Sequence, residues 1–240
     1  MGDIGPRVLV VDDELAIRRF LRASLSAQGY QIFEAASGEH ALQAAAADRP
    51  DLVILDLGLP DLDGVEVTRR LREWSKVPVI ILSVRGHEQD KIAALDAGAD
   101  DYLTKPFGIG ELLARMRVAM RHGAQPADEP VVTVGDLTVD VARRLTAVAG
   151  REIALTPVEY SLLRTLAVHA GRVLTHGQLL REVWGPGYVR DGNLLRVNIS
   201  KLRHKIEPEP GRPRYIVTEP GVGYRLRVPA DRLPDSPATM

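Results

Sequence analysis

The sequence predicts an α/β domain built on a doubly wound, five-stranded parallel sheet, followed by a smaller α+β domain. Three observations support this fold class. The length of 240 residues suits two ordinary domains of about 100–150 residues each. Strand-like and helix-like segments alternate up to residue 122, as they do in βαβ units. Beyond residue 130 the pattern changes to short strands followed by helices, which indicates a second fold.

The first domain is expected to alternate strands and helices. The strands are short β-branched runs at Val8–Val11, Gln31–Glu34, Leu52–Leu55, Val79–Leu82 and Asp101–Thr104. The helices are segments in which apolar residues recur with a helical period, at Ala16–Gln28, Gly38–Ala47, Gly64–Trp74, Glu88–Ala97 and Gly110–Arg121. Right-handed crossovers place helices on both faces of the sheet. Functional side chains then collect at the carboxyl ends of the strands.

A linker is predicted over residues 123–130, which are rich in Pro, Gly, Ala and acidic residues. It separates a first domain over residues 1–122 from a second over 131–229, and a flexible tail is expected over 230–240. The expected strands of the second domain are Val131–Val134, Leu137–Val141, Leu145–Val148 and Glu152–Ala154, with a closing hairpin at Tyr215–Thr218 and Tyr224–Val228. Its expected helices are Pro157–Ala170, His176–Val183 and Asn193–Ile206. Thr156 and Glu159 have the spacing of a capping box at the first of these helices.

Composition and charge narrow the classes of function. The chain has no cysteine, which excludes disulfides, thiolate metal sites and cysteine nucleophiles. No apolar run approaches the ~20 residues that span a bilayer, so we expect a soluble, cytoplasmic protein with no membrane partner. Residues 1–130 hold 15 Lys/Arg against 21 Asp/Glu, whereas residues 131–240 hold 16 against 11. The basic second half is therefore a candidate for binding a polyanion.

Charged and hydroxyl side chains follow four of the expected strands. Asp12 and Asp13 come after the first strand, Asp56 after the third, Ser83 after the fourth and Lys105 after the fifth. In a doubly wound sheet all of these strand ends lie at one edge. Converging carboxylates need a cation, and a set of oxygen ligands favours Mg²⁺. A single aspartate after a strand is commonly a loop former, but the whole set in this order indicates a site.

The set suits the transfer of a phosphoryl group to a carboxylate, which forms an acyl phosphate. Asp56 is the predicted nucleophile because it stands alone at the central strand. Ser83 is expected to bind a phosphoryl oxygen, and Lys105 to pair with the phosphate. The predicted ligands of Mg²⁺ are Asp12, Asp13, Asp56 and the backbone carbonyl of Gly58.

Four segments of the first domain, VLVVDDE, LDLGLPDLDG, ILSVRG and DDYLTKPF, resemble the landmark segments of receiver domains. The resemblance implies a sheet with strand order 2-1-3-4-5, phosphorylation of Asp56 by a sensor histidine kinase and Tyr102 as an aromatic switch. It also implies a cis peptide bond at Lys105-Pro106. Val84 departs from the family pattern, in which a smaller residue follows the Ser or Thr. We expect the larger side chain to slow the access of water or phosphodonor to Asp56.

The segment RDGNLLRVNISKLRHK, over residues 190–205, predicts a basic amphipathic helix. The Arg, Asn, Lys and Ser side chains of its outer face suit the major groove of DNA. Its expected inner face consists of Leu194, Leu195, Val197, Ile199 and Leu202. The predicted DNA contacts are Arg190, Asn193, Arg196, Asn198, Ser200, Lys201, Arg203, His204 and Lys205, with Gly221 and Tyr224 in the following hairpin. The aromatic residues fit a core better than base stacking; they are Tyr160, Trp184 and Tyr224.

This helix follows a short helix and precedes the hairpin YIVTEPGVGYRL, which is the order of a helix-turn-helix with a wing. The segments LTPVEYSLL, GRVLTHGQLLREVWG, LRVNISKLRHKIE and GVGYRL resemble the effector domain of OmpR/PhoB-family regulators. The resemblance implies an α+β winged-helix fold, double-stranded promoter DNA as the ligand, and RNA polymerase as a partner at Trp184–Asp191. The acidic Glu219 in the wing, together with LTPVEY and VWGP, is similar to the KdpE group, regulators of a potassium-transport operon.

The same family uses one face of the receiver to form an active two-fold dimer. The resemblance places this face on the last two helices of the first domain and the strand between them. The implied interface residues are Lys91, Asp100, Asp101, Glu111 and Arg115, with Lys91 paired to Glu111 and Asp100 to Arg115 across the dimer. Asp101 would need a basic partner late in the last helix, where His122 replaces the usual Arg and Arg121 can substitute.

The sequence therefore predicts a two-component response regulator that controls transcription and is not an enzyme. Phosphorylation of Asp56 makes the receivers dimerise, and two winged helices then occupy tandem half-sites on DNA. Two alternatives stay open. A phosphatase of the haloacid-dehalogenase type needs a second Asp two residues after the nucleophile, where Gly58 stands. A DNA-binding regulator with a vestigial receiver would act without phosphorylation.

Overall fold

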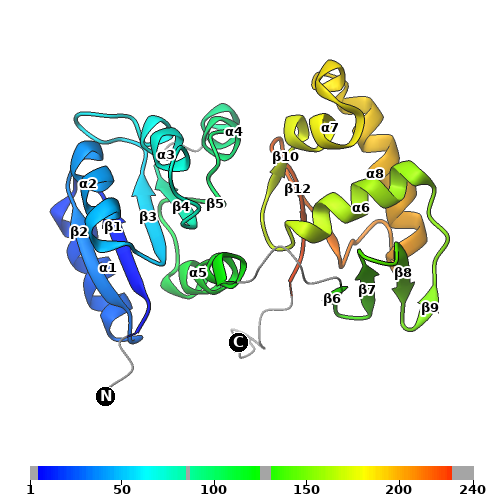
Figure 1. Ribbon diagram of the computed structural model, residues 1–240, viewed down its shortest axis with the longest axis horizontal. Coiled ribbons are helices and arrows are strands. Elements are labelled where there is room, and N and C mark those ends of the chain that lie inside the picture. The colour runs from blue at the N-terminus through cyan, green and yellow to red at the C-terminus, as the bar shows by residue number, and fades with distance from the viewer. Residues whose placement is uncertain (1–4, 85–86, 125–130, 229–240) are drawn as a thin grey trace, which may run out of the picture.

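The computed structural model describes residues 5–84, 87–124 and 131–228, with only the backbone of 121–124. These residues form two domains that lie side by side (Figure 1). The first contains a five-stranded sheet and helices α1–α5, and the second contains two smaller sheets and helices α6–α8. Most of the predicted linker and the whole of the predicted tail over 230–240 lie outside the described residues.

The sheet of the first domain is parallel, with strand order β2-β1-β3-β4-β5, as predicted. Its three central strands are almost entirely apolar and buried, which a sheet covered on both faces requires. The strands are β1 (Arg7–Val11), β2 (Gln31–Ala35), β3 (Leu52–Asp56), β4 (Val79–Ser83) and β5 (Asp101–Thr104).

Helices cover both faces of this sheet. On one face α1 (Leu15–Ser26) and α5 (Ile109–Ala124) pack against Val8, Val10, Ile54 and Ile80. On the other face lie α2 (Gly38–Asp48), α3 (Gly64–Arg72) and α4 (Glu88–Asp96). Alternate residues of each strand face opposite cores, so both layers hold the strand ends in place.

The second domain combines two antiparallel sheets with three α-helices, which is a winged-helix arrangement. A four-stranded sheet contains β6 (Val131–Val134), β7 (Leu137–Asp140), β8 (Leu145–Val148) and β9 (Arg151–Glu152). A three-stranded sheet contains β10 (Leu174–Thr175), β12 (Gly223–Leu226) and β11 (Ile216–Glu219), in that order. The helices are α6 (Pro157–Val168), α7 (His176–Trp184) and α8 (Gly192–Ile206), with the 3-10 turn η1 (Pro186–Tyr188) before α8.

Helices α6 and α7 both begin with a capping box. In α6 the Thr156 side chain accepts from the backbone N–H of Glu159, whose carboxylate accepts from the Thr156 N–H. This is the predicted start of the helix. In α7 Thr175 and Gln178 make the same reciprocal pair of bonds. The sequence contains this second box, but its Thr lies on β10, a two-residue strand that was not predicted.

The structure corrects one predicted position on α8. Val197 was expected on the inner face, but it is 44% exposed, while Leu195, Ile199 and Leu202 are buried. A helical period of 3.6 residues places position 197 two residues from Leu195 and Ile199, nearly opposite both on the helix. The inner face is completed by Ile206 instead.

Candidate functional site

The predicted pocket forms at the carboxyl edge of the parallel sheet. Asp12 follows β1, Asp56 ends β3 and Ser83 ends β4, and these three residues are 2%, 7% and 1% exposed. Lys105 follows β5 and places its Nζ 2.7 Å from Asp12 Oδ2 and 3.0 Å from Asp56 Oδ1. Parallel strand ends thus bring together residues that lie 93 positions apart in the chain.

The two oxygens of Asp56 have different surroundings. Oδ2 accepts the backbone N–H of Gly58 at 2.7 Å. Oδ1 is buried and forms the ion pair with Lys105, but it has no hydrogen-bond partner among the described residues. This oxygen can therefore accept a further bond to a cation or to phosphorus.

Lys105 is the positive charge that balances the two carboxylates. Burial alone would lower the pKa of its ammonium group, but the carboxylates of Asp12 and Asp56 outweigh burial and raise that pKa. The pKa of Lys105 in the folded protein is therefore higher than that of an ordinary lysine. The charged ammonium group stabilises the fold fully at pH values below the ordinary lysine pKa, and this stabilisation is lost only as the pH rises through the folded pKa. Lys105 therefore stays charged at neutral pH.

Of the predicted metal ligands, the structure brings the side chains of Asp12 and Asp56 together, but not that of Asp13. Asp12 and Asp56 face Lys105, but the parts of the chain that the structure describes contain no group of three acidic, His or Cys side chains arranged to hold a metal. Asp13 is exposed. Lys105 neutralises the other two carboxylates. The oxygen donors, among them Asp56 Oδ1 with no hydrogen-bond partner among the described residues, nevertheless fit a hard cation such as Mg²⁺.

Several side chains on the outer side of α8 form hydrogen bonds within the protein. Asn198 donates to Leu194 O at 2.8 Å, and the His204 ring lies 2.7 Å from Ser200 O. Arg203 donates to Ile216 O and to Thr218 Oγ1, and burial lowers its pKa. The predicted DNA contacts that are exposed on the helix and just before it are Arg190, Asn193, Arg196, Ser200, Lys201, His204 and Lys205.

Two further predicted DNA contacts have structural partners. Lys205 Nζ lies 2.6 Å from Glu159 Oε2 and so ties the end of α8 to the start of α6. Tyr224 is 5% exposed and packs in the core of the second domain, as expected for a core aromatic. Gly221, at the tip of the hairpin, has a φ of +72°, which favours glycine.

The comparisons with known proteins agree with this geometry. The family model for the response regulator receiver domain matches residues 8–117, and the model named "Transcriptional regulatory protein, C terminal" matches residues 150–226. The KDP operon transcriptional regulatory protein KdpE of Escherichia coli is 56% identical over 91% of this chain and 98% of its own length. The transcriptional regulatory protein KdpE of Mycobacterium tuberculosis is 49% identical over 91% of this chain and 98% of its own length.

The chain belongs to the OmpR/PhoB family of two-component response regulators. It is a KdpE-like transcription regulator with a receiver domain and a DNA-binding effector domain, and not an enzyme. The phosphatase alternative is therefore excluded. Among the described residues, none of the helices combines the length and apolar character that crossing a bilayer requires.

The receiver contains a residue at the pocket that the sequence did not single out. The guanidinium of Arg18 on α1 donates to the carbonyl oxygens of Asp12 at 2.5 Å and Asp13 at 2.9 Å. It therefore holds the loop that carries both acidic side chains. Asp61 has a similar role after β3, because its carboxylate accepts the N–H groups of Glu39 and Gly38, which lowers its pKa. The only feature of the sequence that could have pointed to Arg18 is its position in the first turn of a helix that follows an acidic loop.

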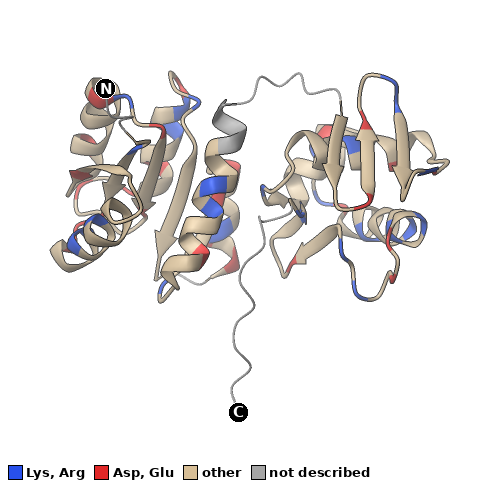
Figure 2. Ribbon diagram, turned by 90° about the horizontal axis from the view of Figure 1, so that it is seen from below, with Lys and Arg blue, Asp and Glu red and all other residues tan. Residues whose placement is uncertain are grey.

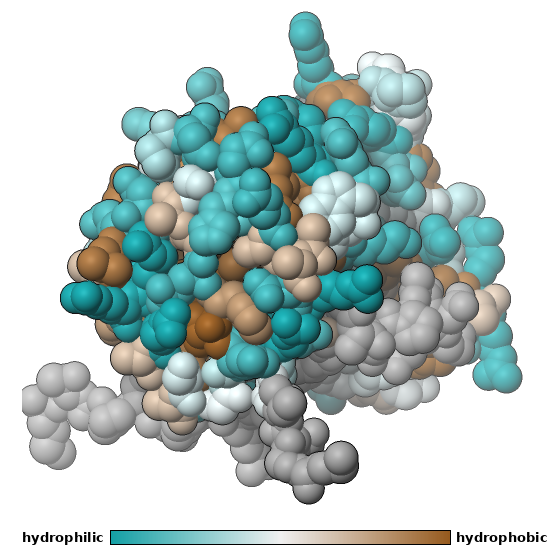
Figure 3. All heavy atoms as spheres, turned by 60° about the vertical axis from the view of Figure 1, so that its left-hand side comes forward, coloured by the Kyte–Doolittle hydropathy of each residue, from teal (hydrophilic) through white to brown (hydrophobic). Residues whose placement is uncertain are grey.

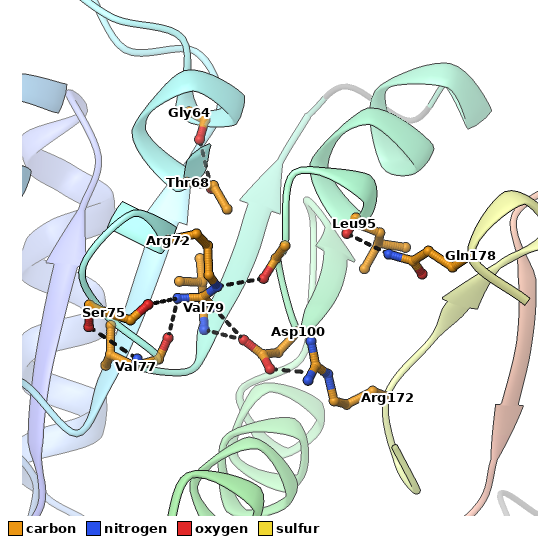
Figure 4. A network of polar contacts seen from close by, with 11 residues as sticks. Gly64, Thr68, Arg72, Ser75, Val77, Val79, Leu95, Asp100, Arg172 and Gln178 are labelled. Carbon is orange, nitrogen blue, oxygen red and sulfur yellow. Dashed lines mark hydrogen bonds and ion pairs between the residues drawn. The ribbon is translucent and has the colours of Figure 1, made fainter. Parts of the chain in front are cut away.

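The predicted dimer-interface residues of the receiver have partners within the chain. Asp100 Oδ2 accepts from Arg72 Nη2 and from the Val79 N–H, both at 2.8 Å (Figure 4). Its other oxygen lies 3.1 Å from Arg172 Nε of the effector domain. Arg72 also donates to the carbonyls of Gly98, Ser75 and Val77.

The neighbouring Asp101 pairs with Arg115 on α5 at 2.6 Å. Burial would lower the pKa of the Arg115 guanidinium, but Asp101 and Glu111 outweigh it and raise that pKa. Lys91 lies over the Tyr102 ring, 5.7 Å from its centroid. The charged residues of α5, coloured in Figure 2, are one acid near its start, Glu111, followed by Arg115 and Arg117. The side chains of Arg121 and His122 lie outside the described residues.

Two features named from the resemblance are placed by the structure. The Lys105-Pro106 peptide bond is cis, as predicted. Tyr102 is 8% exposed on β5. Val84 is 71% exposed next to Ser83, and its effect on access to Asp56 stays a prediction.

Proposed function

We propose that Asp56 accepts a phosphoryl group from a sensor histidine kinase and that this modification controls DNA binding by the effector domain. The observation that carries the proposal is Asp56 Oδ1, which is buried beside Lys105 and has no hydrogen-bond partner among the described residues. A carboxylate oxygen of Asp56 attacks the phosphorus of a phosphohistidine. The P–N bond breaks and the imidazole leaves with its electron pair.

The side chains around Asp56 have distinct roles in this proposal. Lys105 pairs with the phosphoryl group, Ser83 binds one of its oxygens, and Tyr102 changes position in response. Mg²⁺, when bound, neutralises charge on the phosphoryl oxygens. Its proposed ligands are Asp12, Asp13, Asp56 and the Gly58 carbonyl.

Phosphorylation is proposed to favour a homodimer of receivers, through Lys91, Asp100, Asp101, Glu111 and Arg115. Two effector domains then bind adjacent half-sites of promoter DNA, which raises the effective concentration of the second. RNA polymerase is the further partner, at Trp184–Asp191. The base-reading candidates are Arg190, Asn193, Arg196, Ser200 and Lys201; Asn198, Arg203, His204 and Lys205 would have to exchange their present partners for DNA.

The boundaries and the target are also part of the proposal. We assign the receiver to residues 1–122, the linker to 123–130, the effector to 131–229 and the tail to 230–240, in a cytoplasmic protein. Because one relative is a KDP operon regulator and a second is also named KdpE, we propose a potassium-transport operon as the target.

The test is a DNA-binding titration with the chain's own upstream region and with potassium-transporter promoters. Wild type and Asp56→Ala are compared with and without a small-molecule phosphodonor and Mg²⁺. We expect the donor to tighten binding of the wild type only. Equal binding of both proteins under all conditions would show a regulator that acts without phosphorylation. Binding to neither DNA above a random fragment would overturn the proposed target.

A further inference from the structure

The receiver and effector domains contact each other along one edge of the receiver (Figure 1). The receiver side, here called the docking edge, consists of Glu88, Leu95, Asp96, Asp100 and Asp101. The effector side, here called the docking face, consists of Arg172, Thr175, Gln178, Gly221 and Arg225. The docking edge carries four acidic residues and the docking face carries two arginines, so the two surfaces attract each other.

The polar centre of the contact is the start of α7. The Thr175 hydroxyl accepts the Gln178 N–H at 3.1 Å and donates its proton to Asp96 Oδ1 at 2.7 Å. The Gln178 side chain accepts the Thr175 N–H and donates from Nε2 to Leu95 O at 2.9 Å. Both members of the capping box therefore use their spare donors on the receiver.

The capping boxes of α6 and α7 differ in the residue at position N3 of the helix. In α6 Glu159 supplies a carboxylate that neutralises the positive end of the helix dipole. The first turn of α7 contains no acidic residue, because Gln178 takes the place of the Glu. The helix start is thus left open for an anion from outside, and Asp96 supplies that anion.

Ion pairs and apolar contacts flank this centre. Arg172 Nε lies 3.1 Å from Asp100 Oδ1 (Figure 4), and Arg225 Nη1 lies 3.6 Å from Asp101 Oδ2. Two effector valines, Val173 and Val222, are 7% and 5% exposed and pack with the receiver's apolar cluster. The side of the receiver that faces away from the effector is mainly hydrophilic, with small scattered apolar patches (Figure 3).

The contact also covers the tip of the wing. Gly221 approaches the Glu88 carboxylate so closely that a Cβ at this position would force the flexible Glu88 side chain to move. A wing that binds the minor groove needs its tip free. A carboxylate at this tip occupies space that DNA would take.

We propose that Asp96 occupies the position of a DNA backbone phosphate at the start of α7, so that a chain docked in this way and a chain bound to DNA exclude each other. Helix N-termini, hydroxyl groups and arginines all bind DNA phosphates. Here the Thr175 hydroxyl binds Asp96, while the flanking Arg172 and Arg225 bind Asp100 and Asp101. This inference deepens the proposed function and rests on it: the receiver silences the effector by presenting carboxylates in place of phosphates.

The contact is built to be reversible. Asp96 is exposed, so breaking its bond leaves no buried charge without a partner. Asp100 and Asp101 remain paired with Arg72 and Arg115 when the effector leaves. The same two aspartates belong to the proposed dimer interface, so dimerisation and docking compete for one surface.

The variant that tests the proposal is Asp96→Ala, which changes only the receiver and cannot remove a DNA contact. Asp90→Ala is the matched control, because it removes the same charge from the same helix. In the unphosphorylated full chain we expect Asp96→Ala to bind its promoter about fivefold more tightly than Asp90→Ala, the effect of one lost hydrogen bond. The difference should disappear after phosphorylation. Equal affinities before phosphorylation would overturn the proposal.

A second measurement separates this inference from the proposed function. Amide hydrogen exchange is followed in α4 and in the first turn of α7, with and without a DNA fragment of unrelated sequence. We expect the fragment to increase exchange near Leu95 and Asp96 in the wild type, because phosphates displace the carboxylate, and Asp96→Ala to show that exchange already without DNA. Unchanged exchange in both cases would overturn the phosphate mimicry, even if phosphorylation controls DNA binding. If exchange responds but the phosphodonor changes nothing, only the proposed function fails.

Discussion

The receiver holds two groups of acidic side chains whose charge is balanced in different ways. At the pocket, Asp12 and Asp56 share Lys105, which comes from the same domain. At the docking edge, Asp100 and Asp101 each have one arginine from the receiver, Arg72 or Arg115, and a second from the effector. The pocket depends on one shared cation, whereas Asp100 and Asp101 keep a receiver arginine with or without the effector.

The difference teaches what each group can do. A buried pair of carboxylates with a single cation responds strongly to any added charge, which suits a site where a phosphoryl group is received. At the docking edge, Asp100 and Asp101 can lose the effector arginines at a small cost in free energy, because each keeps its receiver arginine. This suits a surface that alternates between the effector domain and another receiver.

The largest effect is expected from Lys105→Ala, which removes the shared cation of the pocket. Without it the transferring phosphoryl group loses its positive partner, and we expect acyl-phosphate formation to fall by about 10²-fold or more. Separation of phosphorylated and unphosphorylated chains on a phosphate-affinity gel measures this. The exposed Lys76→Ala is the control. A variant that is phosphorylated at the wild-type rate would contradict the role of Lys105.

A smaller effect is expected from Arg72→Ala at the docking edge. The variant leaves Asp100 without its inner cation and three backbone carbonyls without a donor. We expect the free energy of unfolding to fall by about 3 kcal/mol, as when one partner of a buried ion pair is removed. Urea unfolding of the full chain measures the loss, with the exposed Arg69→Ala on the same helix as control. Equal stability of the two variants would mean that the effector arginine alone can neutralise Asp100.

The smallest effect is expected from Arg18→Ala, because Arg18 acts on the pocket only through backbone carbonyls. The loop that carries Asp12 and Asp13 loses a support, so a several-fold higher Mg²⁺ concentration should be needed for half-maximal phosphorylation. Arg19→Ala, one residue further on the exposed side of α1, should leave the Mg²⁺ requirement unchanged. A shift that is the same in both variants would assign the effect to net charge rather than to the position of the loop.

Local patterns were enough to predict much of this protein. The parallel sheet and the α6 capping box follow from strand and helix patterns, and the convergence of Asp12, Asp56 and Ser83 follows from the rule that functional groups collect at strand ends. The strand order was implied by the resemblance to receiver domains. Boundaries shifted by one or two residues at many elements, because helix ends fray and depend on their caps. Val197 was misplaced because an apolar residue on a helix need not face the core.

What the sequence by itself determined is the content of each domain: the fold, the residues at the pocket and the basic character of α8. Only the tertiary structure decided which charges meet. Arg18 reaches two carbonyls, Arg203 and Lys205 turn toward the wing and α6, and the spare donors of Thr175 and Gln178 bind the receiver. The physical reason is that periodicity encodes the face a side chain occupies within its own element, whereas a contact between elements depends on their mutual placement.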